Sequence, residues 1–236
     1  MTPPHCVCPV LEALASEGLI DPAGITDEQF VRGARRLGLA TDMDGVPLKL
    51  LSDIRAEHGV ASFDAINKHN GIAGESDGSM FKQDYQLGDH TLVSEERVAA
   101  LHALSRDGVT VTLGELVTHW LSMLDSSAES NSRFDLSVIQ VSYVLVQNLA
   151  TLFALLQRGD GRVPLSSIDE LMLHKRIPPH NRLTKLAVLV HFPYVLARLA
   201  THVATSPPLA LALSRRWLAP AYDTLAFARV AWNRAR

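Results

Sequence analysis

Helix-start signals recur along this sequence and constrain its fold more than any other feature. Capping boxes, in which a Ser or Thr is followed three residues later by Glu or Gln, predict helices that begin after Thr26, Thr112 and Ser167. Strand signals are few, since only residues 109–112 alternate with β-branched side chains, and this run is too short to carry a sheet. The sequence therefore predicts an all-α fold. Its 236 residues can enclose one sizeable core, so we expect a single domain over residues 1–236.

The charge balance and one apolar run indicate which partners to expect. The formal net charge of -3 gives no basic footprint for nucleic acid, so we expect no nucleic acid partner. Residues 138–156 carry no charged side chain and are long enough to raise the question of a membrane span. Amides such as Gln147 and Asn148 interrupt this run, and amides are costly inside a bilayer. We therefore interpret it as a buried core helix and expect no membrane partner.

The two cysteines of the chain, Cys6 and Cys8, lie one residue apart, which is too close for an easy disulfide. Pro9 is favoured as the first residue of a helix, and this places Cys8 at the N-cap. The positive end of a helix stabilises a thiolate, which is a good nucleophile or metal ligand. Cys6 lies outside the helix and gains nothing from its position. The alternative for Cys8 is an inert, buried small side chain.

Residues 67–91 form a long segment rich in Gly, Asp and Asn, and a loop of this length in a compact domain is typically functional. Within it, Glu75, Ser76, Asp77 and Ser79 bring carboxylates, a hydroxyl and backbone carbonyls close together. Hard oxygen ligands of this kind suit Mg²⁺ or Mn²⁺. The alternative is a solvated acidic turn.

Two segments of the chain carry a family resemblance. Residues 8–20, CPVLEALASEGLI, follow a pattern that opens with Cys-Pro, continues through Leu-Asn-x-Leu-Ala and reaches a Gly. Residues 66–89, INKHNGIAGESDGSMFKQDYQLGD, follow a pattern in which Asn-Lys-His leads to Glu-x-Asp, then Ser, a basic residue and Gly-Asp. Together the segments resemble the heme-thiolate peroxidases, the fungal chloroperoxidase and unspecific peroxygenase family. A fainter match at residues 171–179 extends the resemblance to about residue 180.

The resemblance implies an all-α fold of the chloroperoxidase type around a heme pocket. By similarity, Cys8 would be the proximal thiolate ligand of a heme b iron. The side chains of Glu75 and Ser79, with the carbonyl of Ser76, would hold Mg²⁺ or Mn²⁺ beside a heme propionate, and Asp77 would brace that loop. The expected activity is oxidation of a small organic substrate, with hydrogen peroxide as a possible co-substrate.

The sequence departs from the family pattern on the distal side of the predicted heme. Family members carry an acid-base glutamate on a helix before a Gly-Asp turn, whereas the matching position before Gly159 is Asn148, next to Gln147. An amide does not titrate, so neither residue can exchange a proton with peroxide as a carboxylate does. We therefore expect an atypical enzyme in which both amides line the distal pocket. Glu129 is the alternative acid under another alignment.

Three further interpretations stay open at this stage. The distal amides could be satisfied core groups that bond neighbouring helices. The chain could be a biosynthetic enzyme with a repurposed heme pocket, or a heme-free helical protein that binds a partner or a membrane.

The first ten residues lack the apolar run of a secretory signal, so we expect a cytoplasmic protein or a trimmed secreted form.

Overall fold

The computed structural model of this protein is mainly helical, as the sequence predicted. It covers residues 5–40, 45–68, 79–84, 86–132, 134 and 146–214. The helices are α1 (Pro9–Ser16), α2 (Asp27–Arg36), α3 (Gly45–His58), α4 (Phe63–Lys68), α5 (Glu95–Leu104), α6 (Leu113–Ser130), α8 (Val146–Leu156), α9 (Leu165–Met172), α10 (Lys185–Thr205) and α11 (Pro207–Ser214). The all-α prediction is confirmed, and the single domain stays a prediction.

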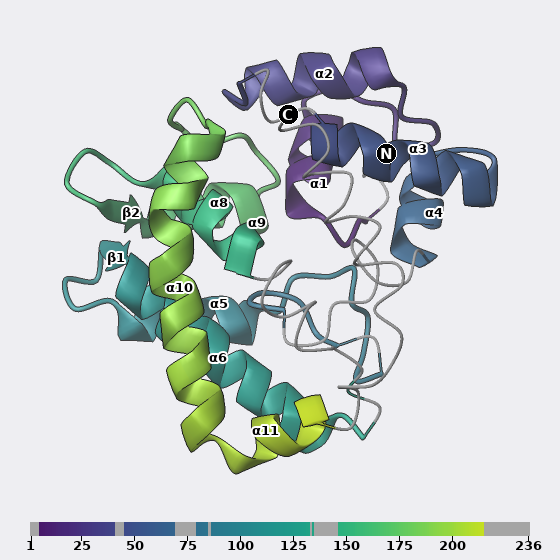
Figure 1. The fold of residues 1–236 in the computed structure, drawn as a ribbon. Helices are drawn as coiled ribbons and strands as arrows, with labels where there is room; N and C mark the ends of the chain where they lie inside the picture. Colours follow the sequence, from purple (N-terminus) through teal and green to yellow (C-terminus); the bar gives the residue numbers. More distant parts are fainter. Residues whose placement is uncertain are drawn as a thin grey trace.

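The helices pack around two hydrophobic clusters that meet at α1. Helices α1 to α4 surround the smaller cluster, and α5 to α11 surround the larger one, with α10 lying along α8 and α6 (Figure 1). Leu11 and Leu14 of α1 belong to the smaller cluster, whereas Ala13 belongs to the larger one. Helix α1 also packs against α9. Both clusters therefore fix the position of α1, the helix that Cys8 precedes.

A two-stranded sheet is the one element that the sequence only half predicted. Strand β1 (Thr110–Thr112) pairs antiparallel with β2 (Arg162–Pro164), and Val111 lies opposite Val163. The sequence pattern marked β1 and missed β2, because Arg-Val-Pro carries no alternation of its own and becomes a strand only through its distant partner. The pair joins the start of α6 to the start of α9.

The predicted helix starts are correct at two of the three capping boxes. Thr26 caps α2 and Thr112 caps α6, and the backbone N–H of each Thr in turn donates to the side chain of its Gln or Glu partner. The third prediction is wrong, because Ser167 lies buried inside α9 and caps nothing. Strand β2 runs directly into α9, and the N–H of Leu165 donates to the carbonyl of Val109 at 2.9 Å. This sheet contact sets the helix start two residues before Ser167.

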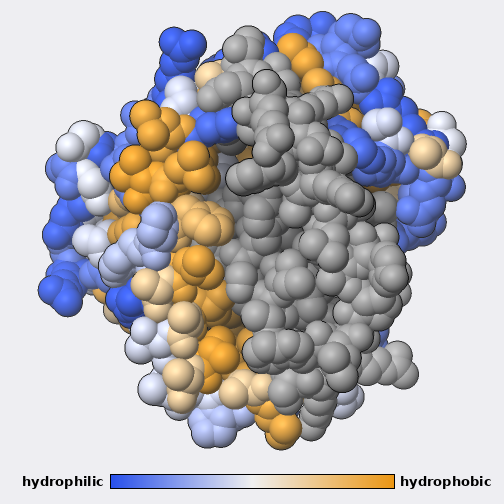
Figure 2. Space-filling view, in the orientation of Figure 1, coloured by the Kyte–Doolittle hydropathy of each residue, from blue (hydrophilic) through white to orange (hydrophobic). Residues whose placement is uncertain are grey.

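The described part of the predicted core helix, α8, is buried as expected. Leu149 and Phe153 pack in the larger cluster, whereas residues 138–145 lie outside the described part of the chain. Among the described helices, α10 is the one long and apolar enough to cross a membrane by length and composition. Its inner side packs in the core, and Leu186, Leu189 and Val190 are exposed along its outer side, where Figure 2 shows an apolar surface.

Candidate active site

Cys8 lies at the N-cap of α1, as the sequence predicted. Its backbone is extended, with φ -96° and ψ 108°, and Pro9 is the first helical residue. The carbonyl of Cys8 accepts the first helical hydrogen bond, from the N–H of Glu12 at 3.2 Å. The thiol is partly buried and makes no capping hydrogen bond to the described first turn of α1. The sulfur is thus held at the positive end of a helix.

Burial and the helix start act on the Cys8 thiol in opposite directions. Burial is the larger effect and raises its pKa, while the backbone N–H groups of Leu11 and Val10, and then the charge of Lys82, lower it. The helix start therefore favours the thiolate as predicted, but the effect of burial on the pKa is larger. A coordinated metal ion deprotonates a thiol outright. The donor chemistry of this sulfur fits a buried metal ligand better than a solvent-exposed nucleophile.

Cys6 lies beside this site and has a different environment. It is fully buried in the smaller hydrophobic cluster, and burial raises the pKa of its thiol well above the usual range. Cys6 and Cys8 are both free thiols. The prediction that Cys6 has no functional role was made for its sulfur. The backbone N–H and carbonyl of Cys6 are bound by charged side chains.

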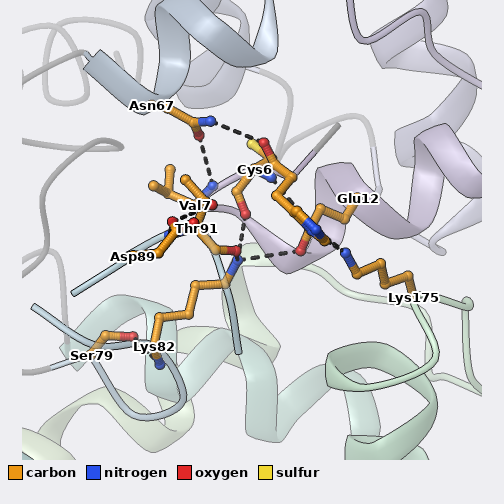
Figure 3. A network of polar contacts seen from close by, with 10 residues as sticks. Cys6, Val7, Glu12, Asn67, Ser79, Lys82, Asp89, Thr91 and Lys175 are labelled. Carbon is orange, nitrogen blue, oxygen red and sulfur yellow. Dashed lines mark hydrogen bonds and ion pairs between the residues drawn. The ribbon is translucent and has the colours of Figure 1, made fainter. Parts of the chain in front are cut away.

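Buried side chains bind the backbone of the segment that precedes α1 (Figure 3). Glu12 Oε1 accepts from the N–H of Cys6 at 3.2 Å, and Lys82 Nζ donates to the carbonyl of Cys6. Asn67, at the end of α4, accepts from the N–H of Val7 at 2.9 Å. Helix α1 itself and two segments distant in sequence, α4 and the loop at Lys82, therefore converge on two residues just before Cys8.

Glu12 and Lys82 are a buried pair of opposite charges. Their exposed side-chain fractions are 2% and 5%, and Lys82 Nζ lies 3.3 Å from Glu12 Oε2. Lys82 also donates to the carbonyl of Thr91 at 2.7 Å, and Lys175 Nζ lies 2.8 Å from Glu12 Oε1. In the sequence, the signal that singles out Glu12 is a charged side chain inside the apolar stretch 9–15.

The loop that carries Lys82 and Ser79 is fastened to α5 and α6. Arg97 of α5 donates to the carbonyl of Ser79 at 2.6 Å and to the carbonyl of Lys82. The buried carboxylate of Asp84 accepts from Ser127 and Asn131 of the α6 end, and lies 3.8 Å from Arg97. The hydroxyl of Ser79 accepts from the N–H of Lys82 at 3.2 Å.

Several predicted site residues lie outside the described part of the chain. These are Glu75, Ser76 and Asp77, so of the predicted Mg²⁺ or Mn²⁺ ligands the structure places Ser79 alone. Gln147 and Asn148 lie on α8, but their side chains are outside the described part. Within the described residues, no group of three or more His, Cys, Asp or Glu side chains could hold a metal ion. The metal site and the distal pocket stay predictions.

A cavity of about 360 Å³ lies at the C-terminal end of α8. Residues of α8, β2, α9 and the segment before α10 line it, including Arg158, Glu170 and Asn181. Asn181 Nδ2 donates to the carbonyl of Ala154 at 3.3 Å, so this side chain serves the end of α8. Cys8 does not line the cavity.

Comparison with known families decides which class of protein carries this site. The sequence model of the family described as Peroxidase, family 2, matches residues 4–185, which is most of the chain. The chain belongs to this family. It is the chloroperoxidase family, and its match spans Cys8, Glu12, Lys82 and α8 and ends at the first residue of α10. No curated protein matches the sequence.

Membership of the chloroperoxidase family makes this protein an oxidoreductase with a peroxidase-like oxidising function. It indicates a heme-type cofactor and a small-molecule substrate. The matched residues include Cys8 and all of α1. Helix α11 and nearly all of α10 lie beyond the match.

Proposed function

We propose that this chain is a heme-thiolate enzyme that oxidises a small organic substrate with peroxide, and that Cys8 is the axial ligand of heme b. The observation that carries the proposal is the position of Cys8 at the start of α1, within the segment that matches the chloroperoxidase family. When bound, a thiolate-ligated heme supplies O–O bond cleavage and transfer of oxidising equivalents.

The residues around Cys8 would set how its sulfur holds negative charge. The N–H groups of Val10 and Leu11 favour the anion, and so does the ammonium of Lys82. Each of these interactions withdraws electron density from the sulfur, so each moderates the donation of charge to the metal. Burial keeps bulk water from competing for the sulfur.

We propose that Glu75, Ser79 and the Ser76 carbonyl hold Mg²⁺ or Mn²⁺ beside a heme propionate. Both oxygens of Ser79 accept a hydrogen bond, the carbonyl from Arg97 and the hydroxyl from the N–H of Lys82. The hydroxyl keeps a second lone pair, which would bind the cation. Arg97 and Lys82 also fix the loop that carries this hydroxyl.

The distal side of the proposed site would be atypical. Gln147 and Asn148 follow Val146 in the first turn of α8, and neither amide can take up or release a proton in the physiological range. A peroxide bound there would have to lose and regain its proton without a carboxylate. We therefore propose that activation of peroxide is slow in this enzyme.

The absorption spectrum of the full chain, purified from cells supplied with heme, tests the proposal. The reduced protein under carbon monoxide should show a strongly red-shifted Soret band. Cys8→Ala should lose this band, whereas the matched variant Cys6→Ala should keep it. A chain that takes up no heme, or a band that survives in Cys8→Ala, would overturn the proposal.

A further inference from the structure

The segment at residues 5–7, which leads to Cys8, has no helix or strand of its own. Side chains bind four of its backbone polar groups: the carbonyl of His5, the N–H and carbonyl of Cys6, and the N–H of Val7. Asn67 spans this lead segment, because it accepts from the N–H of Val7 and donates to the carbonyl of His5, both at 2.9 Å. Between these two bonds lies Cys6, whose N–H and carbonyl are bound by Glu12 and Lys82.

Burying the charges of Glu12 and Lys82 has a free-energy cost that their mutual attraction alone does not explain. Removing an ion from water costs several kcal/mol even after relaxation, and a buried pair is often no more stabilising than a hydrophobic one. The pair is nevertheless almost fully buried. The Glu12 carboxylate accepts from the backbone N–H of Cys6, and the Lys82 ammonium donates to the backbone carbonyl of the same residue. This arrangement specifies a conformation more than it adds stability.

The charges around Glu12 do not cancel. Among the described residues, the carboxylate lies within 3.3 Å of two ammonium groups, those of Lys82 and Lys175, which leaves one positive charge in excess. His5 Nδ1 also lies 3.2 Å from the carboxylate, but His5 is exposed. Glu12 is thus shared by several cationic groups, and Lys82 among them also binds the carbonyl of Cys6.

We propose that Glu12 and Lys82 are positioning residues that clamp the Cys6 backbone and so fix the sulfur of Cys8 for its ligand. The proposal rests on the proposed function for what Cys8 binds. The clamp itself is a property of the chain, so it can be measured without heme. Glu12 holds the N–H of Cys6 from α1, and Lys82 holds its carbonyl from the second family segment, so the clamp ties the two segments of the family resemblance together.

The main test compares amide hydrogen exchange of the lead segment in the full heme-free chain. The double variant Glu12→Leu/Lys82→Met removes both nearly inaccessible charges with little change of volume, and only the more exposed Lys175 loses its carboxylate partner. The amide to follow is that of Val7. Its hydrogen-bond acceptor, Asn67, is not mutated, so faster exchange there reports a change in the position of the segment and not the loss of the acceptor. We expect its exchange to become at least tenfold faster, since Cys6 would no longer be held.

Lys175→Met is the matched control. It removes a lysine from the same carboxylate but leaves both backbone bonds of Cys6 in place. We expect exchange at Val7 to stay within about twofold of the wild type. A folded double variant with unchanged exchange at Val7, or equal acceleration in Lys175→Met, would overturn the clamp.

A second readout follows the ligand in the heme-loaded protein. The double variant should bind heme with a smaller share of the red-shifted carbonyl band, whereas Lys175→Met should keep the share of the wild type. An unchanged share of the band would overturn the positioning role. Absence of heme from the wild type would instead overturn the proposed function, and the exchange measurement would still decide the clamp.

Discussion

The ammonium of Lys82 donates to the carbonyl of Cys6 from 76 positions further along the chain. This bond connects the loop that carries Ser79 to the lead segment before Cys8. Both segments belong to the part of the chain that matches the chloroperoxidase family. A single lysine therefore connects the proposed metal loop to the segment that carries the proposed heme ligand.

Loss of the cap at Thr112 should destabilise the protein measurably. The hydroxyl of Thr112 accepts from the N–H of Glu115 at 3.2 Å, and Thr112→Ala should lower the free energy of unfolding by about 1 kcal/mol. Ser167→Ala is the control, because Ser167 lies inside α9 and caps nothing. Urea denaturation of both variants checks this. A larger loss in Ser167→Ala would contradict the helix start assigned to α9.

Asp84 should contribute more to stability than any surface carboxylate of the fold. Its side chain is fully buried against Arg97, Ser127 and Asn131, and Asp84→Asn would leave a largely buried guanidinium without its carboxylate. We expect a loss of about 3 kcal/mol in the free energy of unfolding.

Asp53→Asn provides the comparison for Asp84→Asn. Asp53 pairs with Lys49 on the exposed side of α3, so its loss should cost less than about 1 kcal/mol. Urea denaturation at one pH measures both variants. Equal losses would show that Asp84 does not hold the loop at residues 79–84.

His119 should make stability depend on pH below neutrality. Burial lowers its pKa, the carbonyl of Met80 opposes this, and the charge of Arg97 lowers it further. Since the unfolded chain binds the proton more readily, the stability contribution of the neutral ring is full above the ordinary pKa of about 6.5 and is lost as pH falls below it. The free energy of unfolding should therefore drop between pH 7 and pH 5.

His119→Gln is the matched variant for this pH dependence. Glutamine can still donate to the carbonyl of Met80 but does not titrate in this range. Urea denaturation across the pH series should show a shallower decline for the variant. Parallel curves would mean that another group is responsible.

A carboxylate restored on α8 should speed peroxide-driven turnover. We expect Asn148→Glu or Gln147→Glu to raise the rate by a factor of roughly 100, because positioned acid-base groups contribute at least that much. Gln157→Glu, just beyond the C-terminal end of α8, is the control and should give no gain. Steady-state assays with hydrogen peroxide and a small aromatic donor check this. No gain in either main variant would contradict the distal role of these amides.

The sequence by itself determined the features that depend on neighbours within one helical turn. Thr26 and Thr112 each cap a helix through a partner three residues away, and Pro9 places Cys8 at the N-cap by its missing N–H. The family resemblance also lay in the order of residues, and the match to residues 4–185 confirms it. The metal ligands and the distal amides were predicted by that resemblance alone and stay predictions.

Tertiary structure decided the features that depend on distant partners. Strand β2 exists through its pairing with β1, and that pairing moved the start of α9 away from Ser167. Burial reversed the net effect on the Cys8 thiol, because desolvation depends on everything packed around the sulfur, whereas the helix start acts locally. The sequence does not reveal that Glu12 and Lys82 are partners, and only the packing of α1 against the loop at residues 79–84 brings both to the backbone of Cys6.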